Sequence, residues 1–347
     1  MKINFKPVWF DSMGAKSSCS IVETPDINIL IDPGISILHN SFPASDDTKK
    51  RWEKQGRNAI LNQFEKADLI IITHYHYDHY FRDNFEDIMG KKIFIKNPNE
   101  FINDSQRLRS EEFFKKLFLK LNITDFKTKS SSKEYLNPLS ELKIAMNKDF
   151  KTYTKRRQEL LEKGKIWFNK RVEKWNSYQS IPEIEVEKTK IYFPEEKEFS
   201  FGKTKIKFSK PLFHGIEFSR VGWVFSVTVE YDYEKLFYSS DLNGPIIEDY
   251  AQMIINENPD ILILDGPMTY MFGYLLNKIN LNRAIENAVN ILKNVNAELI
   301  IYDHHLTREK RYKDRTKKVW ETATKLNKNL ITASEFYGNK PVCEELK

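Results

Sequence analysis

The chain lacks the features that mark disulfide-bonded, secreted and membrane-spanning proteins. Its 347 residues include only two cysteines, Cys19 and Cys343, whose wide separation fits neither a disulfide framework nor a thiolate zinc site. No apolar run approaches the roughly 18 residues that a membrane-spanning helix needs. The amino terminus also lacks the apolar core of a signal peptide. These absences predict a reduced, cytoplasmic protein with no membrane partner.

The chain also lacks a strong excess of either charge. Lys and Arg number 55 against 49 Asp and Glu, a net charge of +6 that does not by itself indicate a nucleic-acid partner. A hydrophobic content of 40% and an aromatic content of 13% can fill a sizeable core, which excludes global disorder.

Short apolar runs bounded by turns fill both ends of the chain and predict strands. In the first hundred residues, strands are expected as a pair within Ser20–Ile31 joined at Pro25-Asp26, and at Leu69–Thr73 and Ile93–Lys96. After residue 191 they are expected at Lys205–Phe208, Trp223–Tyr231, Lys235–Tyr238, Ile261–Leu264 and Leu299–Tyr302. The last two each follow a helical segment, as in βαβ units.

The middle of the chain differs from both ends in its charge density and in the spacing of its apolar residues. Between residues 100 and 190 charged residues are dense, and apolar residues from Leu160 to Trp175 recur at steps of three and four, which predicts a helix. We therefore predict one domain over residues 1–347, made of an N-terminal half (1–99), a helical insertion (100–190) and a C-terminal half (191–347). Two sheets are expected to pack face to face between helical layers.

The sharpest motif is the run Thr73-His74-Tyr75-His76-Tyr77-Asp78-His79, directly after an apolar strand. In an extended segment His74 and His76 point to the same side and can hold one ion. A helix predicted over Tyr80–Met89 would place Asp78 and His79 at its start, facing a second ion. Three of the seven histidines fall within six residues here, which favours metal binding over a chance cluster.

Further candidate ligands follow later strands, namely His214, Asp241, His304 and His305. Each alone is typical of a hydrogen-bonded loop or turn residue. Together they stand at strand ends, where α/β architectures place their sites. Asp32 and Asp265 also end apolar strands, and either orient ligand histidines as hydrogen-bond acceptors or simply close turns.

The motif His74-x-His76-x-Asp78-His79, followed by His214, Asp241 and a late histidine, resembles the metallo-β-lactamase superfamily. More narrowly, the chain resembles an uncharacterised, mostly archaeal family within it at Asp11-Ser12-Met13-Gly14, Ile31-Asp32-Pro33-Gly34, Leu264-Asp265-Gly266-Pro267 and Asp303-His304-His305-Leu306. The resemblance covers both strand-rich halves and skips most of the insertion. It implies an α/β fold, a four-layer αββα sandwich with the site at one edge between the sheets.

The resemblance also implies a ligand set for two divalent ions. It assigns His74, His76 and His214 to the first ion, and Asp78, His79 and a late histidine to the second, with Asp241 bridging. His305 is favoured because His305-Leu306-Thr307 is similar to the His-apolar-Ser pattern of superfamily phosphodiesterases. His304 is the alternative, since a one-residue shift at a strand end reverses which side chain faces inward. Zinc is the default ion, and manganese or iron suits the same ligands.

Two cations about 3.5–4 Å apart would lower the pKa of a shared water enough to leave hydroxide at neutral pH. Asp78 and Asp241 are the predicted catalytic carboxylates that orient it. Seven basic residues against two acidic ones lie between Arg308 and Lys318, just past His305. Arg308, Lys310 and Arg311 are therefore candidates for binding a substrate phosphate.

These features predict a metal-dependent hydrolase of a phosphodiester or another phosphate-containing substrate, nucleic acid among the candidates. Two alternatives stay open. The first is hydrolysis of a lactone, thioester or other acyl compound, for which the basic residues are incidental. The second is a metal-bearing nucleic-acid-binding protein without turnover, which salt-dependent binding without hydrolysis would favour.

Overall fold

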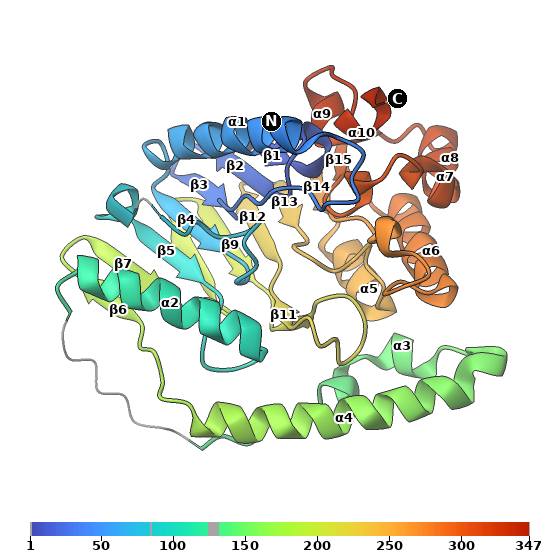
Figure 1. Ribbon diagram of the computed structural model, residues 1–347, viewed down its shortest axis with the longest axis horizontal. Coiled ribbons are helices and arrows are strands. Elements are labelled where there is room, and N and C mark those ends of the chain that lie inside the picture. Colours follow the sequence, from blue (N-terminus) through green and yellow to red (C-terminus); the bar gives the residue numbers. More distant parts are fainter. Residues whose placement is uncertain (1, 84, 124–131, 347) are drawn as a thin grey trace.

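Two seven-stranded sheets form the centre of the molecule (Figure 1). The computed structural model describes residues 2–83, 85–123 and 132–346. The first sheet has the order β1-β2-β3-β4-β5-β7-β6, with parallel pairing from β3 to β7 and antiparallel pairing at both edges. Its strands are β1 (Asn4–Phe10), β2 (Ser18–Glu23), β3 (Asn28–Ile31), β4 (Leu69–Ile72), β5 (Lys92–Ile95), β6 (Ile184–Val186) and β7 (Thr189–Tyr192).

The second sheet is built in the same manner, with the order β16-β15-β14-β13-β12-β9-β8. Pairing is parallel from β13 to β16 and antiparallel from β8 to β13. Its strands are β8 (Glu198–Phe201), β9 (Thr204–Phe208), β12 (Val227–Tyr231), β13 (Glu234–Tyr238), β14 (Ile261–Leu264), β15 (Leu299–Tyr302) and β16 (Leu330–Ile331). A separate two-stranded ladder joins β10 (Leu212–Phe213) to β11 (Trp223–Val224).

Alternation of side chains along the central strands explains why the sheets stack. In β4 the side chains of Leu69 and Ile71 join the core between the two sheets, while Ile70 and Ile72 join the core beneath the helices. Strand β14 alternates in the same way. Every residue of β4 is buried, as predicted for a wholly apolar strand. Such strands are stable only with a layer on each face.

Helices provide those outer layers, and this arrangement confirms the predicted αββα sandwich. Helix α1 lies along the blue strands of the first sheet, and α5 and α6 lie beyond β13 and β14 (Figure 1). The helices are α1 (Asp46–Phe64), α2 (Asp104–Lys120), α3 (Lys143–Asn147), α4 (Thr154–Ser177), α5 (Glu248–Glu257), α6 (Lys278–Asn294), α7 (Tyr312–Arg315), α8 (Lys317–Lys325), α9 (Ala333–Phe336) and α10 (Val342–Glu345).

The region predicted as a helical insertion contains α2, α3 and α4. Helix α4 runs along one side of the molecule, below the loop between β10 and β11 in Figure 1. Its apolar stripe packs inward: Phe168 and Trp175 are buried, and Trp167 stacks on Trp223 with ring centroids 5.5 Å apart. The strand pattern returns earlier than expected, since β6 begins at Ile184 and joins the first sheet.

Two local predictions were wrong. The helix predicted over Tyr80–Met89 is absent from the described residues, which show only a short 3-10 helix at Phe85–Ile88. Tertiary contacts hold this segment: a Cβ added to Gly34 would lie 2.3 Å from the backbone nitrogens of His79 and Tyr80. The single strand predicted over Trp223–Tyr231 is divided between β11 and β12, because its first part pairs with β10 and its second with β9 and β13.

Within the described residues, no helix is long and apolar enough to cross a bilayer. Cys19 and Cys343 are both buried and free.

Candidate metal centre

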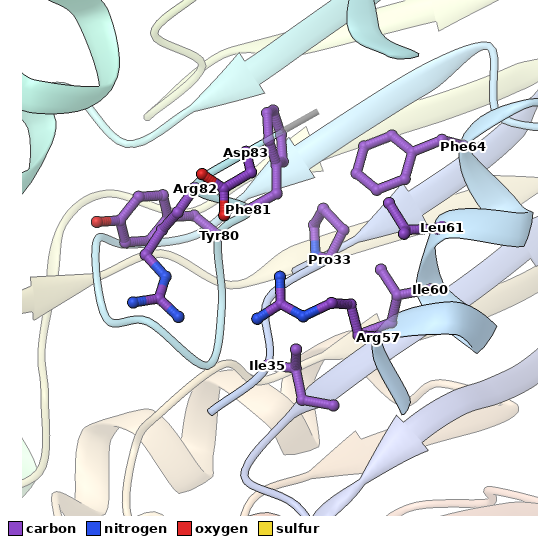
Figure 2. Close-up of a pocket in the computed structure, with 10 residues that line it drawn as sticks. All are labelled: Pro33, Ile35, Arg57, Ile60, Leu61, Phe64, Tyr80, Phe81, Arg82 and Asp83. Atoms are coloured by element: carbon purple, nitrogen blue, oxygen red, sulfur yellow. The ribbon is translucent and has the colours of Figure 1, made fainter. Parts of the chain in front are cut away.

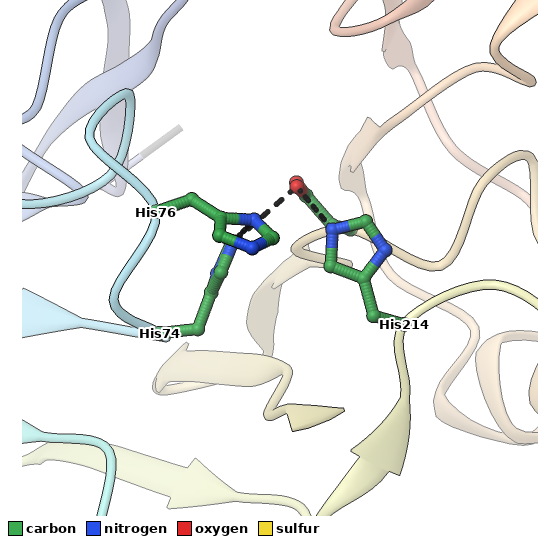
Figure 3. Close-up of side chains that lie close together, drawn as sticks. His74, His76 and His214 are labelled. Atoms are coloured by element: carbon green, nitrogen blue, oxygen red, sulfur yellow. Dashed lines mark hydrogen bonds and ion pairs between the residues drawn. The ribbon is translucent and has the colours of Figure 1, made fainter. Parts of the chain in front are cut away.

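The candidate ligands follow the carboxyl ends of strands from both sheets, so the architecture brings them to one edge. His74 and His76 follow β4, His214 follows β10, and Asp241 follows β13. His304 and His305 follow β15. Figure 3 shows the side chains of His74, His76 and His214 pointing toward one another. The structure thus brings together side chains that lie up to 231 positions apart in the sequence, as for His74 and His305.

The Asp241 carboxylate lies at the centre of this cluster. The Nε2 atoms of His214, His79 and His74 lie 3.0, 3.2 and 3.4 Å from Asp241 Oδ2. His304 Nε2 lies 3.5 Å from Oδ1, and His305 Nε2 lies 3.6 Å from Oδ2. Five imidazole nitrogens therefore surround one buried carboxylate.

The polar atoms at this centre lack ordinary hydrogen-bond partners. Both carboxylate oxygens of Asp241 and the Nε2 atom of His214 are buried without a partner among the described residues. Elsewhere nitrogen faces nitrogen: His79 Nε2 lies 3.2 Å from His304 Nε2, and His74 Nε2 lies 3.0 Å from His76 Nδ1. Unpaired buried acceptors are costly. Divalent cations would bind the unpaired carboxylate oxygens and the imidazole nitrogens together, so the residues present fit a metal centre.

Charge at the centre agrees with this interpretation. Burial would raise the pKa of Asp241, but the neighbouring histidines, His79 foremost, outweigh it and hold the pKa well below its ordinary range. Burial dominates the lowered pKa of His74, which is about 4, and also lowers the pKa of His76 well below its usual value. Burial would lower the pKa of His79, but Asp241 and Asp32 outweigh it and raise that pKa to about 10. A divalent cation would take the place of this proton, because ligation requires neutral imidazoles beside an ionised carboxylate.

Hydrogen bonds fix the far side of most of these rings. His79 Nδ1 lies 2.9 Å from Asp32 Oδ2, and His304 Nδ1 lies 3.1 Å from Asp11 Oδ1. His214 Nδ1 lies 3.2 Å from the Asn243 amide nitrogen, and His74 Nδ1 lies 3.1 Å from Thr73 Oγ1. An acceptor at Nδ1, as for His79 and His304, sets the tautomer that directs the Nε2 lone pair toward the centre. The Asn243 amide nitrogen is a donor, so at His214 the unpaired amide oxygen has to take its place for Nε2 to bind a cation.

Asp32 occupies the position predicted for a residue that orients a ligand histidine. Its carboxylate accepts hydrogen bonds from the Thr73 backbone N–H, the Thr73 hydroxyl and the Tyr238 hydroxyl, in addition to its contact with His79. Asp265 is less directly placed. It accepts from the Asn243 backbone N–H, and its Oδ2 lies 3.6 Å from His305 Nδ1.

The described residues form four overlapping groups that could each hold a cation, one of them Asp32, His74 and His79, and two others match the predicted ligand sets. His74, His76, His214 and Asp241 form one group, and Asp78, His79 and His304 form another, with ligand atoms in each within 4.8 Å of one another. Asp241 also groups with His304 and His305, which suits a bridging position. The geometry therefore favours His304, the alternative in the sequence prediction, over His305 as the partner of Asp78 and His79.

The two late histidines differ because the chain turns sharply between them. His305 has a φ of 67°, a left-handed conformation that is uncommon outside glycine. The turn leaves His304 Nε2 3.8 Å from Asp78 Oδ2, while His305 lines the open cleft. The sequence His304-His305 alone did not predict this backbone conformation.

A cleft of about 320 Å³ opens over the centre, with His76, Asp78, His214 and His305 in its lining. Three cationic side chains also line it, from Lys16, Arg109 and Arg308. Of the three residues predicted to bind phosphate, only Arg308 is placed there. Lys310 instead donates to the Leu346 carbonyl, and Arg311 is exposed outside the lining of this cleft.

Arg308 is held firmly at the edge of the centre. Its Nε donates to Asp11, and its Nη2 lies 3.0 Å from Asp78 Oδ2. Its Nη1 donates to the Tyr270 hydroxyl at 3.2 Å. Burial disfavours its charge, but Asp11 and Asp78 outweigh that effect and raise the pKa of Arg308 further.

Sequence reasoning missed Asp11, Asn243, Lys16 and Arg109. Asp11 contacts both His304 and Arg308. It belongs to the segment Asp11-Ser12-Met13-Gly14 that resembles the archaeal family, but that resemblance assigned no role to the residue. Asn243 precedes Gly244, a pairing that is typical of a turn, so the sequence did not indicate a role at the site. Lys16 and Arg109 reach the cleft only through tertiary packing.

A second hollow, between α1 and residues 80–83, is unrelated to this centre. Its volume is about 30 Å³, and Ile60, Leu61, Phe64 and Phe81 supply apolar walls (Figure 2). That space holds a few water molecules at most, so we assign it no ligand.

No family model matches the chain. It is 30% identical to UPF0282 protein MJ1629 of Methanocaldococcus jannaschii over 347 residues, covering 96% of this chain and 91% of that protein. The chain belongs to the UPF0282 family. A UPF0282 protein of Korarchaeum cryptofilum is 29% identical over 339 residues, with 97% and 89% covered.

A solved structure is also similar, that of the metallo-β-lactamase fold protein YhfI from Bacillus subtilis. It has a TM-score of 0.40 and 14% sequence identity, covering 91% of this chain and 88% of that one. Family membership with archaeal relatives, and the αββα sandwich of the chain itself, confirm the resemblance predicted from the sequence.

Proposed function

We propose that the protein is a metal-dependent hydrolase that holds two divalent cations and acts on a phosphate ester. The observation that carries this proposal is the convergence of five histidine Nε2 atoms on the buried, unpaired Asp241 carboxylate. A structural role alone does not account for five imidazoles around a carboxylate that has no hydrogen-bond donor.

The candidate ligands would hold two cations. His74, His76 and His214 would hold one cation, Asp78, His79 and His304 the other, and Asp241 would contact both. Two such cations supply Lewis acidity and a water of lowered pKa. Zinc is the first candidate, with manganese and iron suited to the same ligands.

The chain's own side chains orient the substrate. Arg308 lines the cleft with a guanidinium whose plane is fixed by Asp11, and its positive charge attracts a phosphate. Lys16 makes no ion pair with any carboxylate of the described residues, so its ammonium is available to an anion. His305 lines the cleft, and its neutral imidazole can donate one N–H to a substrate oxygen.

Three cations around the cleft favour an anionic substrate over a neutral acyl compound. Electrostatic attraction raises the local concentration of an anion, whereas it gives a neutral lactone no advantage. Hydrolysis of acyl compounds remains the competing function, and the same metal centre would serve it.

The decisive experiment combines elemental analysis with a substrate panel. Protein loaded with zinc, manganese or iron is assayed on bis(p-nitrophenyl) phosphate, p-nitrophenyl phosphate and p-nitrophenyl acetate. We expect two metal equivalents and turnover of a phosphate ester. His76→Ala and Asp78→Ala are each expected to lose at least one metal equivalent and all turnover, whereas His39→Ala, which changes the one histidine outside the cluster, keeps its metal.

Turnover that survives His76→Ala or Asp78→Ala would overturn the mechanism. Activity restricted to the acetate ester would move the protein to the acyl class. Salt-dependent nucleic-acid binding with no hydrolysis under any metal would identify a binding protein without turnover.

A further inference from the structure

A third space, a cavity of about 440 Å³, lies beside the metal centre. It is distinct from the cleft over that centre and from the small hollow beside α1. Its walls come from α4, from the loop between β10 and β11, and from segments around residues 246 and 268–280. Apolar side chains dominate the lining, including Leu160, Trp167, Ile216, Phe218, Ile246 and Leu276. Its volume lies in the range of cavities that bind small organic molecules.

The cavity adjoins the cleft over the metal centre. His214, Val221, Met268 and Leu275 line both spaces. A substrate can therefore place one part against the candidate ligands and another part in the cavity. His214 separates the two regions, so the reacting group and the group in the cavity would be close together.

The wall of the cavity is held in place by buried ion pairs. Glu217, in the loop between β10 and β11, accepts from Arg157 of α4 and from Arg283 of α6, each at 2.7 Å. Close packing adds to this, since a Cβ on Gly164 of α4 would lie 2.5 Å from the Phe218 ring. The insertion helix thus contacts the loop that follows His214, and the cavity between them is preformed.

One buried polar group of the cavity lies where the cavity meets the metal centre. The Asn243 amide is almost fully buried and has one polar group beside His214 Nδ1, while the other group has no partner among the described residues. Lys163 and Arg220 also line the cavity, but both are exposed to solvent. Glu217 is a buried charge in the lining, but Arg157 and Arg283 pair with it, so the buried part of the lining suits an uncharged, apolar group.

We propose that this cavity binds an apolar group of the substrate, and that the protein acts on phosphate esters of amphiphilic alcohols or phenols. The phosphate part of this assignment rests on the proposed function, whereas the apolar part rests on the cavity alone. A polynucleotide carries charge on every residue, and its backbone would have to leave this apolar space unfilled. The helical insertion then serves substrate selection, because α4 supplies one wall.

The test uses two series of probes on the zinc-loaded protein. Alkylphosphonates from methyl to octyl are titrated by calorimetry, and the corresponding alkanols are followed by ligand-observed NMR. Each methylene that enters an apolar cavity strengthens binding about fourfold. We expect affinity to rise with chain length in both series, by at least roughly 100-fold between methylphosphonate and octylphosphonate.

Two matched variants on α4 localise the effect. Leu160 lines the cavity and is 42% exposed, whereas Ile166 lies outside its lining and is 58% exposed. Leu160→Trp is expected to fill part of the cavity and flatten the chain-length dependence by at least about tenfold at octyl. Ile166→Trp is expected to keep it. Circular dichroism checks that both variants fold.

The two proposals fail in different ways. Length-dependent binding of alkanols without any gain from the phosphonate group would support the cavity and refute the anionic cleft. Phosphonate binding that is independent of chain length would overturn the cavity assignment and leave the proposed function intact. Equal effects of Leu160→Trp and Ile166→Trp would also overturn it.

Discussion

Replacement of Asp32 by asparagine is expected to weaken zinc binding about 10- to 100-fold while the chain still folds. The wild-type carboxylate accepts four hydrogen bonds, from the Thr73 N–H, the Thr73 hydroxyl, the Tyr238 hydroxyl and His79 Nδ1. Asparagine keeps the shape of the side chain but replaces one acceptor oxygen with a donor. The loss at His79 is the one that reaches the metal centre.

The magnitude follows from where the amide nitrogen would lie. At the Oδ2 position it would face three donors, so it takes the Oδ1 position, where it opposes only the Thr73 N–H. One buried donor without a partner costs about 1–3 kcal/mol of folding free energy. His79 keeps an acceptor, but a neutral one, and hydrogen bonds to neutral acceptors are roughly half as strong as those to carboxylates.

Two measurements separate these effects. Urea unfolding in the presence of a chelator gives the stability of the metal-free chain, and competition with a chromophoric chelator gives the zinc affinity. Asp260→Asn is the control, because Asp260 accepts a backbone N–H from Lys235 far from the centre. If Asp32→Asn lost stability but bound zinc as tightly as the unchanged protein, Asp32 would support the fold and would not position His79.

Further predictions address the ligand set, the loop that follows His214 and the metal itself. His304→Ala is expected to retain one metal equivalent and His305→Ala two, as measured by elemental analysis; the reverse result would restore His305 as the ligand. Burial raises the pKa of Glu217, but Arg283 and Arg157 outweigh burial and hold it below the ordinary value of 4.5. Its ion pairs therefore stabilise the fold above that pH, and the stabilisation is lost as pH falls through the lower folded-state pKa. Glu217→Gln is expected to cost about 3–5 kcal/mol at pH 7 and to flatten this acid dependence in urea unfolding between pH 7 and pH 3; an unchanged pH profile would remove Glu217 as its source. Chelation is expected to lower the melting temperature, and zinc at 100 times its Kd to restore about 2.7 kcal/mol per site; equal melting curves with and without chelator would contradict a resident metal.

The sequence by itself determined the features that depend on short spacing. The wholly apolar run Leu69–Ile72 has no stable place except between two layers, and the structure buries it as β4. The turn at Pro25-Asp26 separates β2 from β3 as predicted. The spacing of His74, His76, Asp78 and His79 placed metal-binding side chain types at a strand end, and the structure brings them to one edge of the sandwich.

Only the tertiary structure decided the features that depend on distant partners. Asp11 contacts His304 across 293 positions, and Asp32 contacts His79 across 47. The segment after His79 is irregular because the backbone at Gly34 crosses it, which overrides its local helical tendency. The choice between His304 and His305 depended on one left-handed residue, His305.

The cleft and the cavity also depend on contacts between residues that are distant in the sequence. Lys16, Arg109 and Arg308 come from separate parts of the chain, so no short sequence motif contains two of them. Helix α4 was predicted from its apolar stripe, but its position beside His214 is set by Glu217 and Arg157. Local spacing dictates which side chains are available, whereas packing over long sequence separations decides which of them meet.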